Sequence, residues 1–136
     1  MKRVVPSLCV AFMAALVMTS CTSKKSLDAL EGEWSVMAVG DMVVPDSAAA
    51  FLSFNIAEQS LSGYTGCNYL TGALHSVVDA SKPLFSAVGS TRKWCPDMTV
   101  EDALLPALSH VVDFTVDSDT LYLLDSVGSS VIVLAR

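Results

Sequence analysis

Phe51-Leu52-Ser53-Phe54-Asn55-Ile56-Ala57 and Ser60-Leu61-Ser62-Gly63-Tyr64-Thr65-Gly66 together decide the fold of this 136-residue chain. Apolar and polar side chains alternate along both arms, and a period of two is typical of a β-strand with one buried face. Glu58 and Gln59 lie between the arms, where a short polar connection reverses the chain. The pattern therefore predicts a β-hairpin and antiparallel pairing.

Further strand-like runs flank this hairpin, separated by turn residues about every eight to twelve positions. In the segment 32–40, Trp34 and Val36 share one face, and a connection containing Pro45 follows over residues 41–46. The other expected strands span residues 68–77, 84–88, 113–116, 120–124 and 130–134. This spacing is typical of antiparallel β-structure.

One helix is predicted in the body of the chain, after Cys95-Pro96. Thr99 is expected to cap its first turn, where Glu101 and Asp102 complement the positive end of the helix dipole. Pro106 predicts a kink or an early end, because proline lacks a backbone donor. Apolar residues recur at intervals of three and four: Val100, Ala103, Leu104, Ala107, Leu108 and Val111. Such a stripe must pack on a sheet or inside a curled one.

The N-terminus has the features of a signal peptide. Met1-Lys2-Arg3 precedes an apolar run over residues 4–18, and Met18-Thr19-Ser20-Cys21 is similar to the bacterial lipobox. The resemblance implies that Cys21 becomes the mature N-terminus and carries a diacylglyceryl thioether and an N-acyl chain. Several acyl chains hold a protein on a membrane almost permanently. A membrane-spanning anchor is the alternative, although the apolar run is shorter than the about 20 residues that a spanning helix needs.

We therefore expect three parts: a signal peptide over residues 1–20, a lipidated N-terminus and polar tether over residues 21–27, and one domain over residues 28–136. Thr22 follows the lipidated cysteine and resembles the outer-membrane default of enterobacterial lipoproteins, in which Asp at that place retains the protein at the inner membrane. The expected location is the outer membrane, facing the periplasm.

The charge balance argues against nucleic acid as a partner. The chain has 8 basic and 14 acidic residues, and two of the basic ones leave with the signal, so the mature net charge is −8. Binding to phosphates or to anionic lipid surfaces depends on clustered cations. The pairs Lys24-Lys25 and Arg92-Lys93 are too small for such a footprint and are expected to be solvated.

Two cysteines, Cys67 and Cys95, remain in the body once Cys9 leaves with the signal and Cys21 takes the lipid. An isolated even pair in an exported, oxidising compartment favours a disulfide. Two reduced, buried thiols are the alternative.

No catalytic or metal-binding pattern is found. His75 and His110 are the only histidines, and neither stands at a spacing that predicts a Cys-His pair or a zinc site. Gly63, Gly66 and Gly72 fit turns, bulges or close backbone contacts better than a phosphate-binding loop. We expect no enzyme activity and no cofactor.

Several short motifs follow one another along the body: Leu30-Glu31-Gly32-Glu33-Trp34, Gly66-Cys67-Asn68, Ser90-Thr91-Arg92-Lys93-Trp94-Cys95-Pro96, Glu101 with Leu104-Leu105, and Leu121-Tyr122-Leu123. Their order resembles the META domain family, which includes the heat-inducible lipoprotein HslJ of Gram-negative bacteria. The resemblance covers about residues 28–135. It implies an α+β fold in which a strongly curved antiparallel meander sheet packs around one helix, although Pro106 departs from the family's uninterrupted helix.

The same resemblance implies little about activity, since members are typically envelope lipoproteins associated with heat or antibiotic stress. We expect a non-catalytic module that contacts an envelope protein and supports stress tolerance. Its expected contact patch consists of Tyr69, Arg92, Lys93 and Trp94, since exposed aromatic and basic side chains mark protein contacts. A small-ligand carrier with a cavity in the curled sheet is the alternative.

Overall fold

The structure is a computed structural model that describes residues 25–136. The expected signal peptide and the lipidation site Cys21 lie outside the described residues. Leu27, at the end of the expected tether, is buried. Lys25 forms an ion pair with Asp113, with 2.7 Å between Nζ and Oδ1. The packed body thus includes the last residues of the tether segment.

Nine strands form one antiparallel sheet in the order β6-β5-β4-β3-β1-β9-β8-β7, with β2 paired to β1 outside this path. The strands are β1 (Gly32–Val39), β2 (Met42–Val43), β3 (Phe51–Asn55), β4 (Ser60–Tyr64), β5 (Tyr69–Leu74), β6 (Phe85–Ser90), β7 (Asp113–Asp117), β8 (Thr120–Leu124) and β9 (Ser130–Ala135). One α-helix, α1 (Thr99–Leu108), and two short 3-10 helices, η1 (Asp28–Leu30) and η2 (Asp46–Ala48), complete the described chain. Since β6 and β7 end the order without pairing to each other, the sheet is not closed into a barrel.

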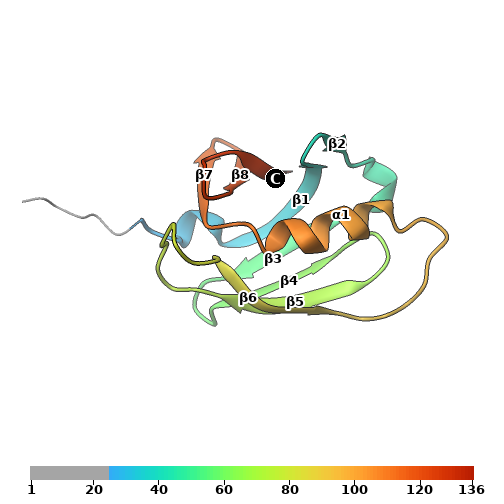
Figure 1. The fold of residues 1–136 in the computed structure, drawn as a ribbon, viewed down its shortest axis with the longest axis horizontal. Coiled ribbons are helices and arrows are strands. Elements are labelled where there is room, and N and C mark those ends of the chain that lie inside the picture. The colour runs from blue at the N-terminus through green and yellow to red at the C-terminus, as the bar shows by residue number, and fades with distance from the viewer. Residues whose placement is uncertain (1–24) are drawn as a thin grey trace, which may run out of the picture.

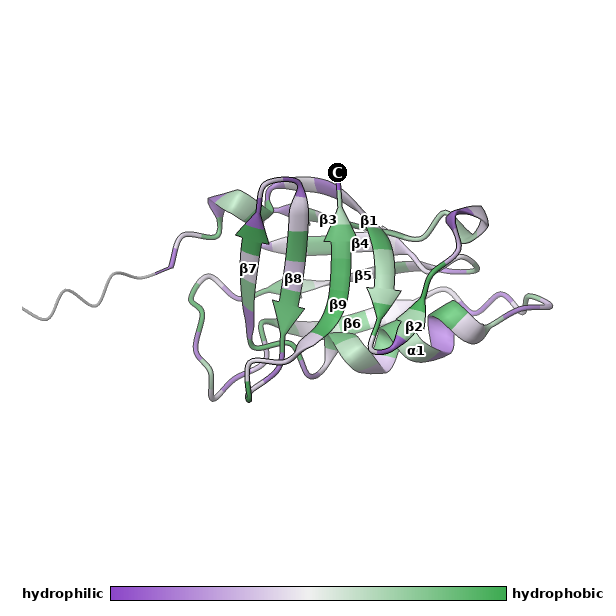
Figure 2. Cartoon of the chain, turned by 90° about the horizontal axis from the view of Figure 1, so that it is seen from above, coloured by the Kyte–Doolittle hydropathy of each residue, from purple (hydrophilic) through white to green (hydrophobic). Residues whose placement is uncertain are grey.

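The sheet curves strongly around α1, which confirms the predicted α+β class. Figure 1 shows α1 between the half of the sheet that contains β7 and β8 and the half that contains β4, β5 and β6. Seen from above, β7, β8, β9 and β1 stand side by side, and β3, β4, β5 and β6 cross behind them (Figure 2). The pairing register shifts in β1–β9, β5–β6 and β8–β9. Such bulges bend a strand and increase its twist, which helps the sheet to curl.

The core lies between the concave face of the sheet and α1. Trp34 from β1, Leu52 from β3 and Phe114 from β7 are buried against Leu104 and Leu108 of the helix. The indole N–H of Trp34 donates to the carbonyl oxygen of Leu30 at 2.9 Å, which satisfies the one polar atom of that side chain. The helix therefore fills the space that the curled sheet encloses.

The helix differs from the sequence prediction at its start. Thr99 is the first helical residue and does not cap the helix. Asp97 accepts the backbone N–H of Thr99 at 2.9 Å instead, two residues before the helix begins. The early end is as expected, because the helix stops at Leu108, two residues after Pro106. Val111 lies beyond the helix but is still buried.

Two further findings concern the strands and glycines. The connection expected over residues 41–46 contains the two-residue strand β2, because the chain turns tightly at Gly40 and pairs back on β1. A Cβ on Gly63 would lie 2.4 Å from the carbonyl oxygen of Phe51, so only glycine fits there. Gly66 has a φ of 96°, which the loop after β4 needs and which glycine adopts without strain.

Candidate functional site

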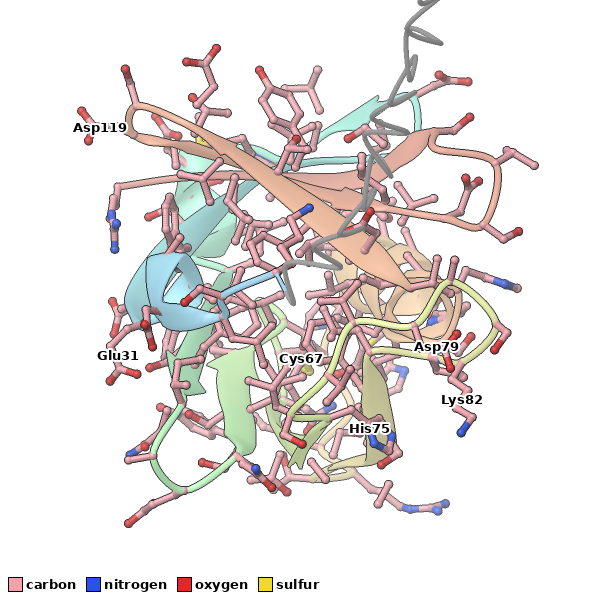
Figure 3. All side chains as sticks on the ribbon, turned by 90° about the vertical axis from the view of Figure 1, so that its left-hand side faces the viewer. Glu31, Cys67, His75, Asp79, Lys82 and Asp119 are labelled. Atoms are coloured by element: carbon pink, nitrogen blue, oxygen red, sulfur yellow. A yellow bond between two sulfur atoms is a disulfide. The ribbon has the colours of Figure 1, made fainter. Side chains whose placement is uncertain are left out.

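The segment Thr91–Met98, here called the contact loop, joins β6 to α1 and has no regular secondary structure. It lies against the turn between β4 and β5. The sulfur atoms of Cys67 in that turn and Cys95 in the loop are 2.09 Å apart, with the Cα atoms 6.0 Å apart. Cys67 is buried, and in Figure 3 its label stands apart from those of Asp79 and Lys82. The predicted pair is thus at disulfide distance.

Asn68, next to the disulfide, fastens the contact loop by hydrogen bonds. Its Oδ1 accepts the backbone N–H of Lys93 at 2.7 Å and the hydroxyl of Thr91 at 2.9 Å. Its Nδ2 donates to the carbonyl oxygen of Lys93 at 2.9 Å. Asn68 is almost fully buried, so these bonds form in a region of low dielectric, where each is stronger than in water. The Asn68 side chain therefore forms hydrogen bonds with both the N–H and the carbonyl oxygen of Lys93, as the backbone of a neighbouring strand would.

Glu101 joins the helix to the same cluster. Its Oε1 accepts the hydroxyl of Thr65 and the Nδ2 of Asn68, both at 2.8 Å, and the side chain is only 7% exposed. The sequence relates Glu101 to the helix dipole and to one motif of the family resemblance, and neither predicts these hydrogen bonds. A signal was present, because Glu101 precedes Leu104 by three positions and Leu108 by seven and so lies on the apolar face of the helix.

A hollow of about 540 Å³ opens beside this cluster. Glu101 and Asn68 line it together with Arg92, Lys93 and Trp94 of the contact loop. Trp94 is 77% exposed, and Arg92 and Lys93 are exposed as well. The arrangement offers a large aromatic surface and two cations on a backbone that is held in place. This suits recognition of another molecule, because little ordering is left to occur on binding.

Tyr69, the fourth residue of the expected patch, faces a different hollow. Its backbone is joined to the contact loop, because the N–H of Thr91 donates to the carbonyl oxygen of Tyr69 at 2.9 Å. Its ring, however, packs on Tyr64 with 5.0 Å between the centroids and lines a hollow of about 740 Å³ at the outer face of the sheet. The structure therefore groups Arg92, Lys93 and Trp94 and places the Tyr69 side chain apart from them.

The histidines lie outside this region. His75 lines a small hollow with Asp79 and Lys82 between β5 and β6 (Figure 3), and His110 is exposed just after α1. Within residues 25–136, no three His, Cys, Asp or Glu side chains are placed so that they could hold a metal ion. No helix in the same range is both long and apolar enough to cross a membrane.

Comparisons with known proteins agree with the fold. The family model of the META domain matches residues 26–136. Two solved structures are similar. An NMR structure of a protein from Burkholderia xenovorans has 25% identity and a TM-score of 0.62, covering 79% of this chain and 83% of its own. A crystal structure of a DUF4847 family protein from Bacteroides vulgatus has 15% identity and a TM-score of 0.52, covering 78% of this chain and 92% of its own. A search of curated proteins finds no match.

Proposed function

Because the chain belongs to the META domain family, we propose that it is a non-catalytic envelope lipoprotein that contacts another envelope protein through the contact loop and so supports stress tolerance. The similar structures carry no stated activity in their descriptions. The proposal therefore depends on the geometry of the loop and on the lipobox-like sequence that ends at Cys21.

The exposed indole of Trp94 on a fastened loop is the observation that carries the proposal. Trp and Arg are enriched among the residues that dominate binding energy in protein interfaces. A tryptophan with 77% of its surface in water has no role in packing the core. The disulfide and Asn68 hold the backbone on both sides of it. A protein partner would thus meet a preorganised aromatic anchor flanked by two cations.

The interior supports a contact module over a ligand carrier. The concave face of the sheet is covered by α1, and Leu104, Leu108 and Trp34 are completely buried there. The hollows described above lie at the loops and on the outer face. A carrier would need its cavity under the sheet, where these side chains are packed.

The proposed lipid anchor at Cys21 limits the distance between the domain and the membrane surface. Cys21 lies four positions before Lys25, and an extended chain of four residue steps spans at most about 14 Å. The ammonium of Lys25 lies 4.5 Å from the centre of the Phe114 ring as well as close to Asp113. A domain tied in this way stays close to the membrane surface, which in this proposal is the periplasmic face of the outer membrane. Its partner would then be another envelope protein at that surface.

Site-specific photo-crosslinking in intact cells tests the proposal. A photoreactive residue replaces Trp94 in one variant and Val127 in a control, because Val127 is equally exposed, at 82%, on the turn before β9. We expect a discrete crosslinked product at position 94 alone. The partner is then identified and purified, and Trp94→Ala should weaken its binding by at least about thirtyfold, equivalent to about 2 kcal/mol. Equal crosslinking at both positions, or unchanged affinity of Trp94→Ala, would refute the role of the loop.

A further inference from the structure

The outer face of the sheet carries two neighbouring cross-strand rows of opposite character. Ser53, Ser62 and Thr71 stand opposite one another in β3, β4 and β5. This polar row is what a solvent-facing side of an antiparallel sheet normally shows. The next row on the same face consists of Phe51, Tyr64 and Tyr69 and is here called the aromatic row.

The three rings of the aromatic row touch in sequence. The centroids of Phe51 and Tyr64 are 6.5 Å apart, and those of Tyr64 and Tyr69 are 5.0 Å apart. Tyr69 nevertheless keeps 64% of its surface in water. Cross-strand aromatic pairs stabilise a sheet, and that is the ordinary use of such a row. Pairing alone does not require a ring that is this exposed at the end of the row.

The aromatic row forms one wall of the hollow of about 740 Å³. Met37 of β1 forms another part of its lining together with Pro45, Asp46, Ala49 and Ala50, and Met37 is also exposed. Two carboxylates, Glu33 and Asp46, face the hollow, and no Lys or Arg lines it. Among residues 25–136 the one ion pair is that of Lys25 with Asp113, so neither carboxylate is neutralised by a basic side chain there. The hollow is therefore aromatic and negatively charged.

We propose that this hollow binds a basic, extended polypeptide segment of a partner protein. Its Lys or Arg side chains would lie over the faces of Tyr64 and Tyr69, where the ring quadrupole attracts a cation. Glu33 and Asp46 would supply the complementary charge, which also speeds encounter with a basic partner. The methylene stems of the same side chains can cover Met37, because long basic residues pack their apolar stems while the charged end stays in water.

A second copy of this chain fits the hollow poorly. Two hollows facing each other would bring four carboxylates together, and the chain has a net charge of −6. Like-charge contacts of this kind oppose association. This hollow is a different surface from the contact loop. The outcome of its test is therefore independent of the function proposed for Trp94.

The test uses the mature lipoprotein in neutral detergent micelles and a fluorescently labelled peptide of about ten residues, which spans about 33 Å when extended. Lys alternates with Ser in the probe and Glu alternates with Ser in its matched control. Fluorescence anisotropy should show binding of the Lys peptide alone, and the affinity should fall as salt is added. Tyr69→Ser and Glu33→Gln should each weaken binding by about fivefold.

Matched variants separate the site from general effects. Val127→Ser removes an apolar side chain elsewhere that is even more exposed than Tyr69, and Glu58→Gln removes an exposed carboxylate at the β3–β4 turn. Both should bind the Lys peptide as the natural sequence does, and thermal unfolding should show that Tyr69→Ser is folded. The proposal is overturned if Glu58→Gln weakens binding as much as Glu33→Gln. It is also overturned if the protein self-associates through this face, or if a neutral oligosaccharide binds there independently of salt while the Lys peptide does not.

Discussion

Two long connections in this molecule are held in opposite ways. The connection from His75 to Leu84, between β5 and β6, is closed mainly by bonds within itself, and only its last residue, Leu84, donates its N–H to a distant group, the carbonyl oxygen of Val111. Ser81 donates its N–H and its hydroxyl to Asp79, and His75 donates its N–H to the carbonyl oxygen of Leu84. The contact loop is instead tied to residues more than twenty positions away, through the disulfide of Cys67 and the hydrogen bonds of Asn68.

The difference shows that exposure alone does not mark a recognition surface. Val77 in the β5–β6 connection is exposed, as Trp94 is in the contact loop. A loop whose middle is ordered by local bonds must lose conformational freedom when it binds, whereas a loop cross-linked to the turn between β4 and β5 has lost that freedom on folding. Trp94 is therefore the stronger candidate for a binding anchor.

Replacing both Cys67 and Cys95 by serine should lower the free energy of unfolding by about 3–4 kcal/mol, because the cross-link no longer restricts the unfolded chain. Urea unfolding measures the change. The natural sequence treated with reductant serves as the control and should match the double variant. An unchanged free energy of unfolding in both would contradict the idea that the disulfide fastens the contact loop.

Asn68→Ala should lower the free energy of unfolding by about 2 kcal/mol, because buried partners such as Glu101 lose a hydrogen bond. Asn55 provides a matched control. Its Oδ1 accepts the N–H of Glu58 within the exposed β3–β4 turn, so Asn55→Ala should cost about 0.5–1 kcal/mol. Equal losses for the two variants, measured by urea unfolding, would mean that the buried position of Asn68 contributes nothing extra.

Hydrogen exchange should distinguish the two connections directly. The amide of Lys93 donates to the buried Oδ1 of Asn68 and should exchange slowly, while the amide of Ser81 donates to exposed Asp79 and should exchange fast. NMR-detected exchange in the folded protein measures both. In Asn68→Ala the Lys93 amide should become as fast as that of Ser81, and slow exchange there would contradict the assigned role of Asn68.

The smallest expected effect is one of pH on Asp79. The hydroxyl and then the backbone N–H of Ser81 donate to this carboxylate and lower its pKa below the ordinary value of 3.8. A group whose pKa is lower in the folded state stabilises the fold above its unfolded pKa, and this contribution is lost as the pH falls through the folded pKa. The stability difference between the natural sequence and Asp79→Asn should therefore shrink below about pH 4. A difference that is equal at pH 7 and pH 3 would exclude this contribution.

Much of the fold was open to prediction because its signals are local. Alternation in residues 51–66 specifies a hairpin, and turn residues separate the later strands. The sequence predicts the position of the helix after Pro96 correctly but predicts the wrong capping residue. Whether Asp97 or Thr99 caps the helix depends on the conformation of the contact loop, which is bonded to residues far away in sequence. Strand β2 was missed because a two-residue strand leaves no periodic pattern.

The candidate site was predicted in part. Cys67 and Cys95 could be paired because they were the two cysteines left in the body. The role of Glu101 could not be found in this way, since its partners Thr65 and Asn68 lie more than thirty residues away. The separation of the Tyr69 side chain from Trp94 could not be predicted either. Alternation along a strand indicates which face of the sheet a side chain is on, but it does not indicate its cross-strand neighbours.

The sequence by itself determined the alternating strands, the apolar stripe of the helix, the cysteine pair and the family, because each depends on neighbours along the chain or on the order of short motifs. The tertiary structure alone decided which side chains meet. The cluster of Thr65, Asn68 and Glu101 forms because α1 packs inside the curled sheet. The aromatic row forms because the β3–β4–β5 register places Phe51, Tyr64 and Tyr69 opposite one another. Register and packing join residues that are far apart in sequence, and a one-residue slip would move each ring to the other face.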